Sequence, residues 1–342
     1  MSSIHHAPRS RLSGLLKATL LAAGLVATTV PSAWAAGHSA APAAGAVKVT
    51  PLGSHTGEFC ALDRALIFED PDGTRILYDA GRTVRGTDDP RLGRIDAVLL
   101  SHVHGDHLGD LVQATENAGT CGAPAFTTRM APKSVTVDVT VGKKARLIVG
   151  AEMGKFFTAR VREAGGQPTQ VQLLRYGAST KVGGVSVSGV TAAHTNGLDP
   201  AFLGKEYADM LEANGLTAYL GPAGGYVLKF SNGLSVYLSG DTGIMADHDA
   251  VIRRFYAPQL VVLNIGSVFT TGPLEAAYVV NELVKPKAVI ASHANEPATE
   301  GGKLRAGTKT ETFMKATQVP VHLPLSGRTM EFNGAGMCTA GC

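Results

Sequence analysis

The sequence predicts an α/β fold of one domain, with four layers in the order helices, sheet, sheet, helices. Two β-hairpin signals, one in each half of the chain, each lead to a carboxylate near glycine, Asp79 and Asp241. Segments with helical spacing alternate with apolar runs, and histidines follow several of these runs. This order favours two sheets packed between helices.

The first 36 residues are expected to be a secretory signal peptide. Arg9, Arg11 and Lys17 form a basic start, residues 18–30 carry no charge, and Ala33-Trp34-Ala35 has the small-x-small pattern of a cleavage site. An uncleaved membrane anchor is the alternative, but the apolar stretch is well short of the ~20 residues that a span needs. The protein is therefore expected in the periplasm or secreted, without a stable membrane anchor.

The charge balance argues against a nucleic-acid partner. The chain has 31 Lys and Arg against 28 Asp and Glu, a formal net charge of +3. Loss of the leader with its three cations leaves the remainder close to neutral, and no basic stripe follows. A small-molecule substrate is the partner expected instead.

The mature chain is expected to be one catalytic domain with short ends. Residues 37–46, rich in Ala, Pro and Gly, are expected to form a flexible arm, residues 47–333 the domain, and residues 334–342 a C-terminal tail.

Four cysteines in an exported chain predict disulfide bonds. They allow three pairings, and we favour Cys60 with Cys121 and Cys338 with Cys342. A third metal site is the alternative, but the spacing matches no standard zinc unit.

The early and late hairpins are marked by their turns. Residues 65–69 and 74–79 flank Asp70-Pro71-Asp72-Gly73, and residues 226–230 and 234–238 flank Ser231-Asn232-Gly233. Buried strands are expected at residues 95–100, 185–190, 260–264 and 288–291. Helices are expected at residues 107–117, 151–164, 200–214, 246–256, 273–283 and 308–317.

One of these helices has two interpretations. The side chains of Phe202, Leu203, Tyr207, Met210 and Leu211 share an apolar face. Because the segment follows His194 closely, it is either a lid over a metal site or ordinary core packing.

The main chemical signal is the string Ser101-His102-Val103-His104-Gly105-Asp106-His107, which follows an apolar strand directly. Alternation along a strand end points His102 and His104 in one direction, while Asp106 and His107 face elsewhere. One short loop therefore offers ligands to two neighbouring cations. Imidazole and carboxylate ligands suit zinc, manganese or iron.

Three further candidate ligands, His194, Asp241 and His293, occur downstream. Two of them, His194 and His293, come shortly after predicted strands, as the His102 string does. Strand ends can gather residues that are distant in sequence.

The string and its partners resemble the metallo-β-lactamase-fold hydrolase superfamily from about Val47 to Met330. The resemblance rests on Tyr78-Asp79-Ala80-Gly81, the His102–His107 string, His194, Ser239-Gly240-Asp241-Thr242-Gly243 and His293. It implies that His102, His104 and His194 bind a first metal ion and that Asp106, His107 and His293 bind a second. Asp241 would bridge both ions, which makes Asp106 and Asp241 the candidate catalytic carboxylates.

Residues 263–290 are similar to the ascorbate-6-phosphate lactonase branch of this superfamily, although the His55 loop and the region around His194 follow that branch less closely. Two residues also argue against particular subgroups of this superfamily. Asp241 argues against a dedicated class B β-lactamase, and His104 argues against a flavodiiron protein, which has glutamate there. Persulfide dioxygenases, which hold a single iron, share several ligands and remain an alternative.

The implied activity is a dinuclear metal-dependent hydrolase that uses a metal-bridging hydroxide. Metal binding lowers the pKa of water from 15.7 to about 7, which provides a nucleophile at neutral pH. Two divalent ions are expected, with zinc first and manganese or iron as alternatives. A lactone or carboxylic ester is the expected substrate, followed by a phosphodiester; an iron persulfide dioxygenase and a non-catalytic metal-binding protein are the alternatives.

Other polar residues have supporting roles in this prediction. Asp79 is expected to accept a hydrogen bond from a ligand imidazole, with a plain turn carboxylate as the alternative. The proton for the leaving group is assigned to Asp106, His248 or metal-bound water, although for His248 a solvated or capping role is favoured. His55 is either a substrate contact or a surface residue, and His322 is expected to be structural.

Overall fold

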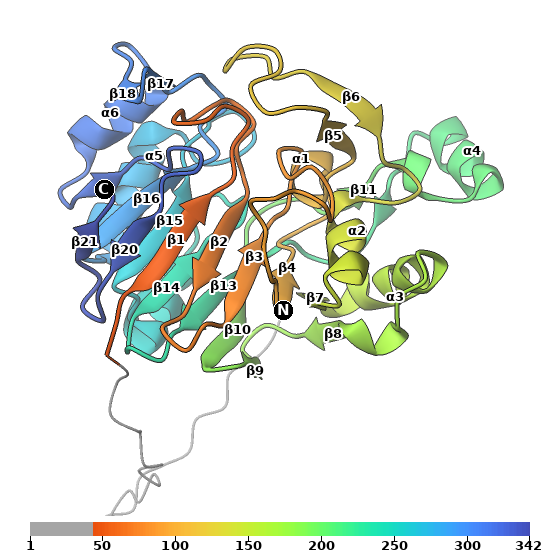
Figure 1. Ribbon diagram of the computed structural model, residues 1–342, viewed down its shortest axis with the longest axis horizontal. Helices are drawn as coiled ribbons and strands as arrows, with labels where there is room; N and C mark the ends of the chain where they lie inside the picture. Colours follow the sequence, from red (N-terminus) through yellow and green to blue (C-terminus); the bar gives the residue numbers. More distant parts are fainter. Residues whose placement is uncertain (1–43) are drawn as a thin grey trace, which may run out of the picture. The chain divides into compact units, whose positions relative to one another are not determined.

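The structure is a computed structural model, which describes residues 44–342. The expected signal peptide and most of the expected N-terminal arm lie outside these residues. Two large sheets form the centre of the described chain (Figure 1). No helix within residues 44–342 combines the length and apolar character that crossing a membrane requires.

The first sheet has eight strands, and the hairpin β2–β3 lies at its centre. Across the sheet, the strands are β21 (Cys338–Ala340), β20 (Met330–Phe332), β1 (Val47–Pro51), β2 (Leu66–Glu69), β3 (Arg75–Tyr78), β4 (Ala97–Leu99), β7 (Arg146–Gly150) and β8 (Val171–Leu174). Strands β3, β4, β7 and β8 run parallel. Strand β21 lies within the expected C-terminal tail, which therefore extends the sheet.

The second sheet has seven strands, of which β14, β15, β16 and β19 run parallel. In order, they are β19 (Val321–His322), β16 (Ala288–Ser292), β15 (Leu260–Asn264), β14 (Ser235–Leu238), β13 (Gly224–Lys229), β10 (Val185–Thr191) and β9 (Ser179–Val182). Three small ribbons lie outside the sheets: β5 (Leu111–Gln113) with β6 (Phe126–Arg129), β11 (Gly197–Leu198) with β12 (Ala218–Tyr219), and β17 (Thr299–Glu300) with β18 (Lys303–Leu304).

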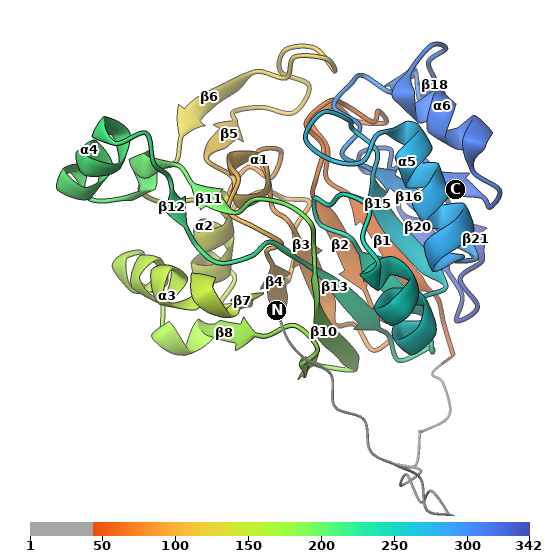
Figure 2. The same ribbon diagram turned by 180° about the vertical axis from the view of Figure 1, so that it is seen from behind.

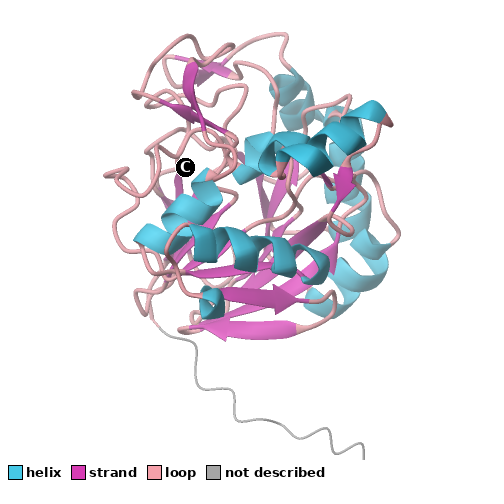
Figure 3. Cartoon of the chain, turned by 90° about the vertical axis from the view of Figure 1, so that its right-hand side faces the viewer, coloured by secondary structure: helices cyan, strands magenta, loops and turns pink. Residues whose placement is uncertain are grey.

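Helical segments cover the outer face of each sheet (Figures 2 and 3). The first sheet packs against α2 (Val135–Gly142) and α3 (Gly154–Glu163), and the second against η4 (His248–Tyr256), α5 (Pro273–Tyr278), η5 (Val279–Val284) and α6 (Lys309–Ala316). The remaining segments are α1 (Gly105–Leu108), α4 (Lys205–Ala213), η1 (Ala151–Met153), η2 (Pro168–Gln170) and η3 (Pro200–Phe202).

Three buried apolar clusters define the four layers. Between the sheets, side chains such as Phe68 and Leu99 meet Leu228 and Val262. The other two clusters lie between each sheet and its helices. The predicted helix–sheet–sheet–helix order is confirmed.

The prediction of a helix at residues 107–117 is wrong. Helix α1 ends at Leu108, because Gly109 adopts φ +80° as its C-cap, and strand β5 follows. A Cβ at Gly109 would lie 2.4 Å from Val135 Cβ, so tertiary packing requires glycine at this turn.

The amphipathic segment after His194 packs as core rather than as a lid. Phe202 is buried in the cluster between the first sheet and its helices, Leu203 packs against that cluster, and Leu211 is buried, while Tyr207 and Met210 are exposed. None of the five apolar side chains lines the cavity above the metal-binding candidates. The predicted single helix is also interrupted between η3 and α4.

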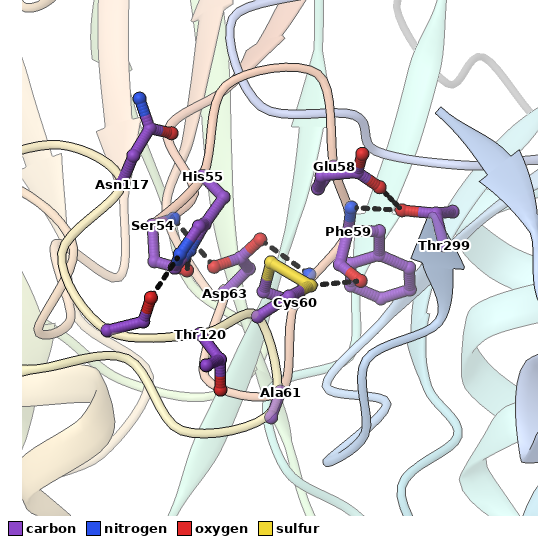
Figure 4. The surroundings of a disulfide bond; sticks show 12 residues. Ser54, His55, Glu58, Phe59, Cys60, Ala61, Asp63, Asn117, Thr120 and Thr299 are labelled. Atoms are coloured by element: carbon purple, nitrogen blue, oxygen red, sulfur yellow. Dashed lines mark hydrogen bonds between the residues drawn. A yellow bond between two sulfur atoms is a disulfide. The ribbon is translucent and has the colours of Figure 1, made fainter. Parts of the chain in front are cut away.

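The cysteines lie in the favoured pairing. Cys60 and Cys121 lie at disulfide distance, with their Cα atoms 4.7 Å apart, and tie the loop after β1 to the β5–β6 ribbon (Figure 4). Cys338 and Cys342 form the second pair, with Cα atoms 6.4 Å apart.

Candidate metal centre

The histidine string lies at the carboxyl end of strand β4. His102 is fully buried, and His104 precedes the short helix α1, which contains Asp106 and His107. Carboxyl ends of parallel strands meet at one edge of a sheet, and ligands bind there in open α/β sheets. The string thus follows β4 of the first sheet, next to the end of β3. The ends of β14 and β16 of the second sheet lie close to it.

Three histidines converge on one point. His102 Nε2 lies 3.1 Å from His104 Nδ1, and His194 Nε2 lies 3.2 Å from the same His104 atom. His194 comes from the loop after β10, so the contact joins the two sheets. These are the three residues expected to bind the first ion.

The second expected group also comes together. His293 follows β16, and its Nε2 lies 3.4 Å from Asp106 Oδ2. His107 Nε2 lies 3.8 Å from the same carboxylate oxygen.

Asp241 lies between the two groups. One of its oxygens is 3.2 Å from His107 Nε2, and the other is 3.0 Å from His293 Nε2. The latter oxygen is also 3.9 Å from His102 Nε2 and 3.7 Å from His194 Nε2. The carboxylate therefore faces the histidines of both groups.

The buried Asp79 carboxylate orients one histidine of the second group. Asp79 Oδ2 accepts a hydrogen bond from His107 Nδ1 over 2.8 Å. The same carboxylate accepts hydrogen bonds from the Ser101 backbone N–H and hydroxyl, each over 2.8 Å. These contacts fix the His107 ring with Nε2 directed at Asp241.

The pKa values of the clustered histidines shift in different directions. Burial lowers the pKa of His102 well below its ordinary value and lowers the pKa values of His104 and His194. Burial also acts to lower the pKa of His107, but the carboxylates of Asp241 and Asp106 outweigh it and raise that pKa well above its ordinary value. The first group is thus neutral imidazole, the form that binds metal.

The carboxylates stay ionised. Burial would raise the pKa of Asp106, but the charges of His107 and Arg64 hold it well below its ordinary value. For Asp241 too, burial is outweighed, by His107 and His293, and its pKa is held well below the ordinary value. Both side chains are therefore electron-pair donors at neutral pH.

The donor atoms of these residues fit divalent cations. A tetrahedral ion with metal–nitrogen bonds of about 2.0–2.1 Å sets its ligand nitrogens about 3.3–3.4 Å apart, close to the spacing of the first group. His107 Nε2 and Asp241 Oδ1 are buried without a hydrogen-bond partner, and a cation between them would satisfy both. The donor set of imidazoles and carboxylates suits zinc, manganese and iron.

Sequence reasoning missed Arg64. Its side chain is 2% exposed and contacts Asp106, with Nε donating to Oδ2 over 3.0 Å. Its Nη2 donates to Asn295 Oδ1 over 2.7 Å. No motif marks Arg64; only the fold brings the loop after β1 to the metal-binding candidates.

The remaining histidines lie apart from the cluster. His55 contacts Ser54 Oγ and the Gly119 carbonyl and does not line the cavity. His248 is buried and not solvated, and its Nδ1 accepts from the Met245 backbone N–H over 3.3 Å. His322 lies near Cys338 and Cys342 at the edges of the two sheets, where those cysteines pair with each other.

Comparison with known proteins identifies the family. The profile described as the beta-lactamase superfamily domain matches residues 74–294, which include every candidate ligand. The chain belongs to the β-lactamase superfamily. A relative from Polynucleobacter asymbioticus, named UPF0173 metal-dependent hydrolase, is 30% identical over 323 residues, which are 90% of this chain and 95% of the relative. A relative of the same family name from Cupriavidus necator is 29% identical and covers 83% of this chain and 87% of its own.

Solved structures of this superfamily share the fold. Igni18, a metallo hydrolase from Ignicoccus hospitalis, superposes with a TM-score of 0.55 at 19% identity and covers 84% of this chain and 99% of its own. The metallo-beta-lactamase fold protein YhfI from Bacillus subtilis gives 0.50 at 14% identity, with 83% and 98% covered. The chain is therefore a metal-dependent hydrolase of the β-lactamase superfamily, which implies a divalent metal and a small-molecule substrate.

Proposed function

We propose that this chain is an exported, dinuclear hydrolase of ester-type bonds, with a lactone or carboxylic ester as substrate and a phosphodiester next. The observation that carries the proposal is the position of Asp241, within 3.0–3.9 Å of nitrogens from both histidine groups. A carboxylate that faces two groups of ligands suits two ions better than one. The similarity of residues 263–290 to the lactonase branch supports a lactone.

The residues have distinct roles in this reaction. Divalent ions held by the two groups supply, when bound, an activated water at neutral pH and polarisation of the substrate oxygen. Asp79 fixes the ring orientation of His107, and the charges of His107 and Arg64 keep Asp106 ionised. Because Asp106 is ionised, it serves as a ligand or proton acceptor, and the proton for the leaving group comes from solvent in the cavity.

Export is part of the proposal. The basic start, the uncharged residues 18–30 and the Ala33-Trp34-Ala35 pattern support it. The two cysteine pairs at disulfide distance agree with an oxidising compartment.

The first experiment is the metal content of the purified mature protein, measured by inductively coupled plasma mass spectrometry. We expect about two zinc or manganese ions per chain and hydrolysis within a panel of lactones and esters. One iron per chain together with oxygen consumption would instead favour a persulfide dioxygenase. Two bound ions without turnover of any ester, lactone or phosphodiester would favour a metal-binding protein.

A substitution then tests the second ion directly. His293→Ala is expected to reduce the content to about one ion and to abolish hydrolysis. His55→Ala, which changes a histidine outside the cavity, is the matched control and should retain both ions. Unchanged turnover in His293→Ala would overturn the dinuclear proposal.

A further inference from the structure

A large cavity opens above the metal-binding candidates. Its volume is about 720 Å³, and His104, His194 and His293 contribute to its wall. Small-molecule sites commonly have volumes of ~300–1,000 Å³. The cavity therefore has room for a substrate that extends well beyond the bond to be cleaved.

Three cationic side chains line this cavity, and they differ in their pairing. Arg64 is paired with Asp106, and Arg82 donates two hydrogen bonds to Asp110, over 2.6 and 2.8 Å. Lys309 has no carboxylate within ion-pair distance among residues 44–342. Among the cationic side chains of this wall, it is therefore the one that forms no ion pair within the described residues.

Neutral carbonyl groups hold the Lys309 ammonium in place. Its Nζ donates to the Gly266 carbonyl over 2.6 Å and to the Asn295 carbonyl over 3.3 Å. An ammonium has three N–H donors, so one is left for a ligand. The nearby carboxylate of Glu296 is occupied elsewhere, by the backbone N–H groups of Lys309 and Thr310 and by the Thr310 hydroxyl.

Hydrogen bonds connect Lys309 to the metal-binding candidates. Asn295, whose carbonyl accepts from Lys309, also accepts from Arg64 through its side chain, and Arg64 donates to Asp106. The ammonium thus lies two side chains away from a candidate ligand. A molecule bound at the cluster can reach it across the cavity.

An apolar surface lies beside this cation. Val268 and Phe269, in the loop after β15, are 88% and 74% exposed and line the cavity. Val268 has φ +54°, a conformation that β-branched residues rarely adopt. Because ligand pockets are lined largely by apolar side chains, these two provide a surface that the apolar part of a ligand can contact.

We propose that the substrate is an anionic, partly apolar ester-type compound. Lys309 binds its carboxylate or phosphate group, Val268 and Phe269 contact its apolar part, and the scissile group lies over the histidine cluster. This inference rests on the proposed ester-type hydrolase function. It adds the charge of the substrate and the residue that selects for it.

The test compares two chromogenic esters with the metal-loaded protein. The mono-4-nitrophenyl ester of suberic acid has a free carboxylate, and its methyl-capped analogue is uncharged. We expect the wild type to prefer the charged ester and Lys309→Gln to reduce the ratio of the two kcat/KM values about tenfold, mainly through KM. Lys309→Arg should keep most of the preference. Lys315→Gln, an exposed lysine of the same helix paired with Glu311, is the matched control and should keep all of it.

A wild type without preference for the charged ester, or a Lys309→Gln variant that loses both activities equally, would overturn the inference. A binding measurement separates its failure from failure of the hydrolase proposal. Isothermal titration with octanoate, octyl phosphate and 1-octanol needs no turnover. We expect at least one anion to bind more tightly than the alcohol and to lose about tenfold in affinity in Lys309→Gln. The tighter anion identifies the charged group, and equal affinities in wild type and variant would overturn the inference even if no ester is cleaved.

Discussion

Asp79 and His107 form a hydrogen-bonded pair in which the Asp79 carboxylate accepts from His107 Nδ1 over 2.8 Å. The contact leaves His107 Nε2 as the ring nitrogen directed at Asp241. Asp79 has φ +42°, an uncommon conformation that turns the chain directly after β3. Asp79, at the end of β3, thus orients the candidate ligand His107 without being a candidate ligand itself.

Asp79→Asn is expected to weaken binding of the second metal ion by about 10–100-fold, since an amide supports the basicity of His107 less well. Competition with a chromogenic chelator measures this affinity. The matched control is Asp70→Asn, because Asp70 is equally buried and also accepts from a serine backbone N–H and hydroxyl, those of Ser231, away from the cluster. Equal metal affinity in the two variants would show that Asp79 has only a structural role.

His248 is expected to make folding stability depend on pH. Burial lowers the pKa of His248 from 6.5 to about 4, so between these values the unfolded chain binds a proton that the folded chain does not. Its contribution is complete above pH 6.5 and is lost as the pH falls towards 4, by about 3 kcal/mol. Urea unfolding of wild type and His248→Asn at pH 7, 6 and 5 measures the difference. Parallel losses of stability in both proteins would contradict the assignment.

The two cysteine pairs are expected to contribute unequally to stability. Removing the Cys60–Cys121 pair by double substitution to serine should lower the free energy of unfolding by about 4 kcal/mol, because a long loop of the unfolded chain is released. The Cys338–Cys342 pair closes a loop of only four residues' separation and should contribute about 2 kcal/mol. Denaturant titrations of both double variants, compared with the wild type, measure these values. A larger loss from the C-terminal pair would contradict this order.

Export predicts a processed N-terminus. When the full chain is expressed in a Gram-negative host, we expect a periplasmic protein that begins at residue 36 or 37, as determined by intact mass and N-terminal sequencing. A chain without residues 1–36 should stay in the cytoplasm and have reduced cysteines. An unprocessed protein in the membrane fraction would instead indicate an anchor.

Local sequence was sufficient for features that depend on short-range chemistry. The turns at Asp72-Gly73 and Asn232-Gly233 join the two predicted hairpins, because these residues favour tight turns whatever surrounds them. The His102–His107 string predicted a metal site because its spacing places several ligands on one loop. His194, Asp241 and His293 follow β10, β14 and β16, and the structure brings all three to that string.

Tertiary packing decided the features in which local preference conflicts with the fold. Residues 135–142, Val-Thr-Val-Asp-Val-Thr-Val-Gly, have β-branched residues that favour a strand, yet they form helix α2. The Ser134 side chain caps this helix, and Val135, Val137 and Val139 are buried against the first sheet. The free energy gained by burying these side chains exceeds the intrinsic preference of the segment for a strand.

The sequence by itself therefore determined the superfamily, the layer order and the seven candidate metal ligands, since these depend on spacing and hydrophobic pattern. Only the tertiary structure revealed Arg64 beside Asp106 and Lys309 beside the cavity. Neither belongs to a motif, because contacts between the loop after β1, the start of helix α6 and the histidine cluster join residues that are far apart in sequence.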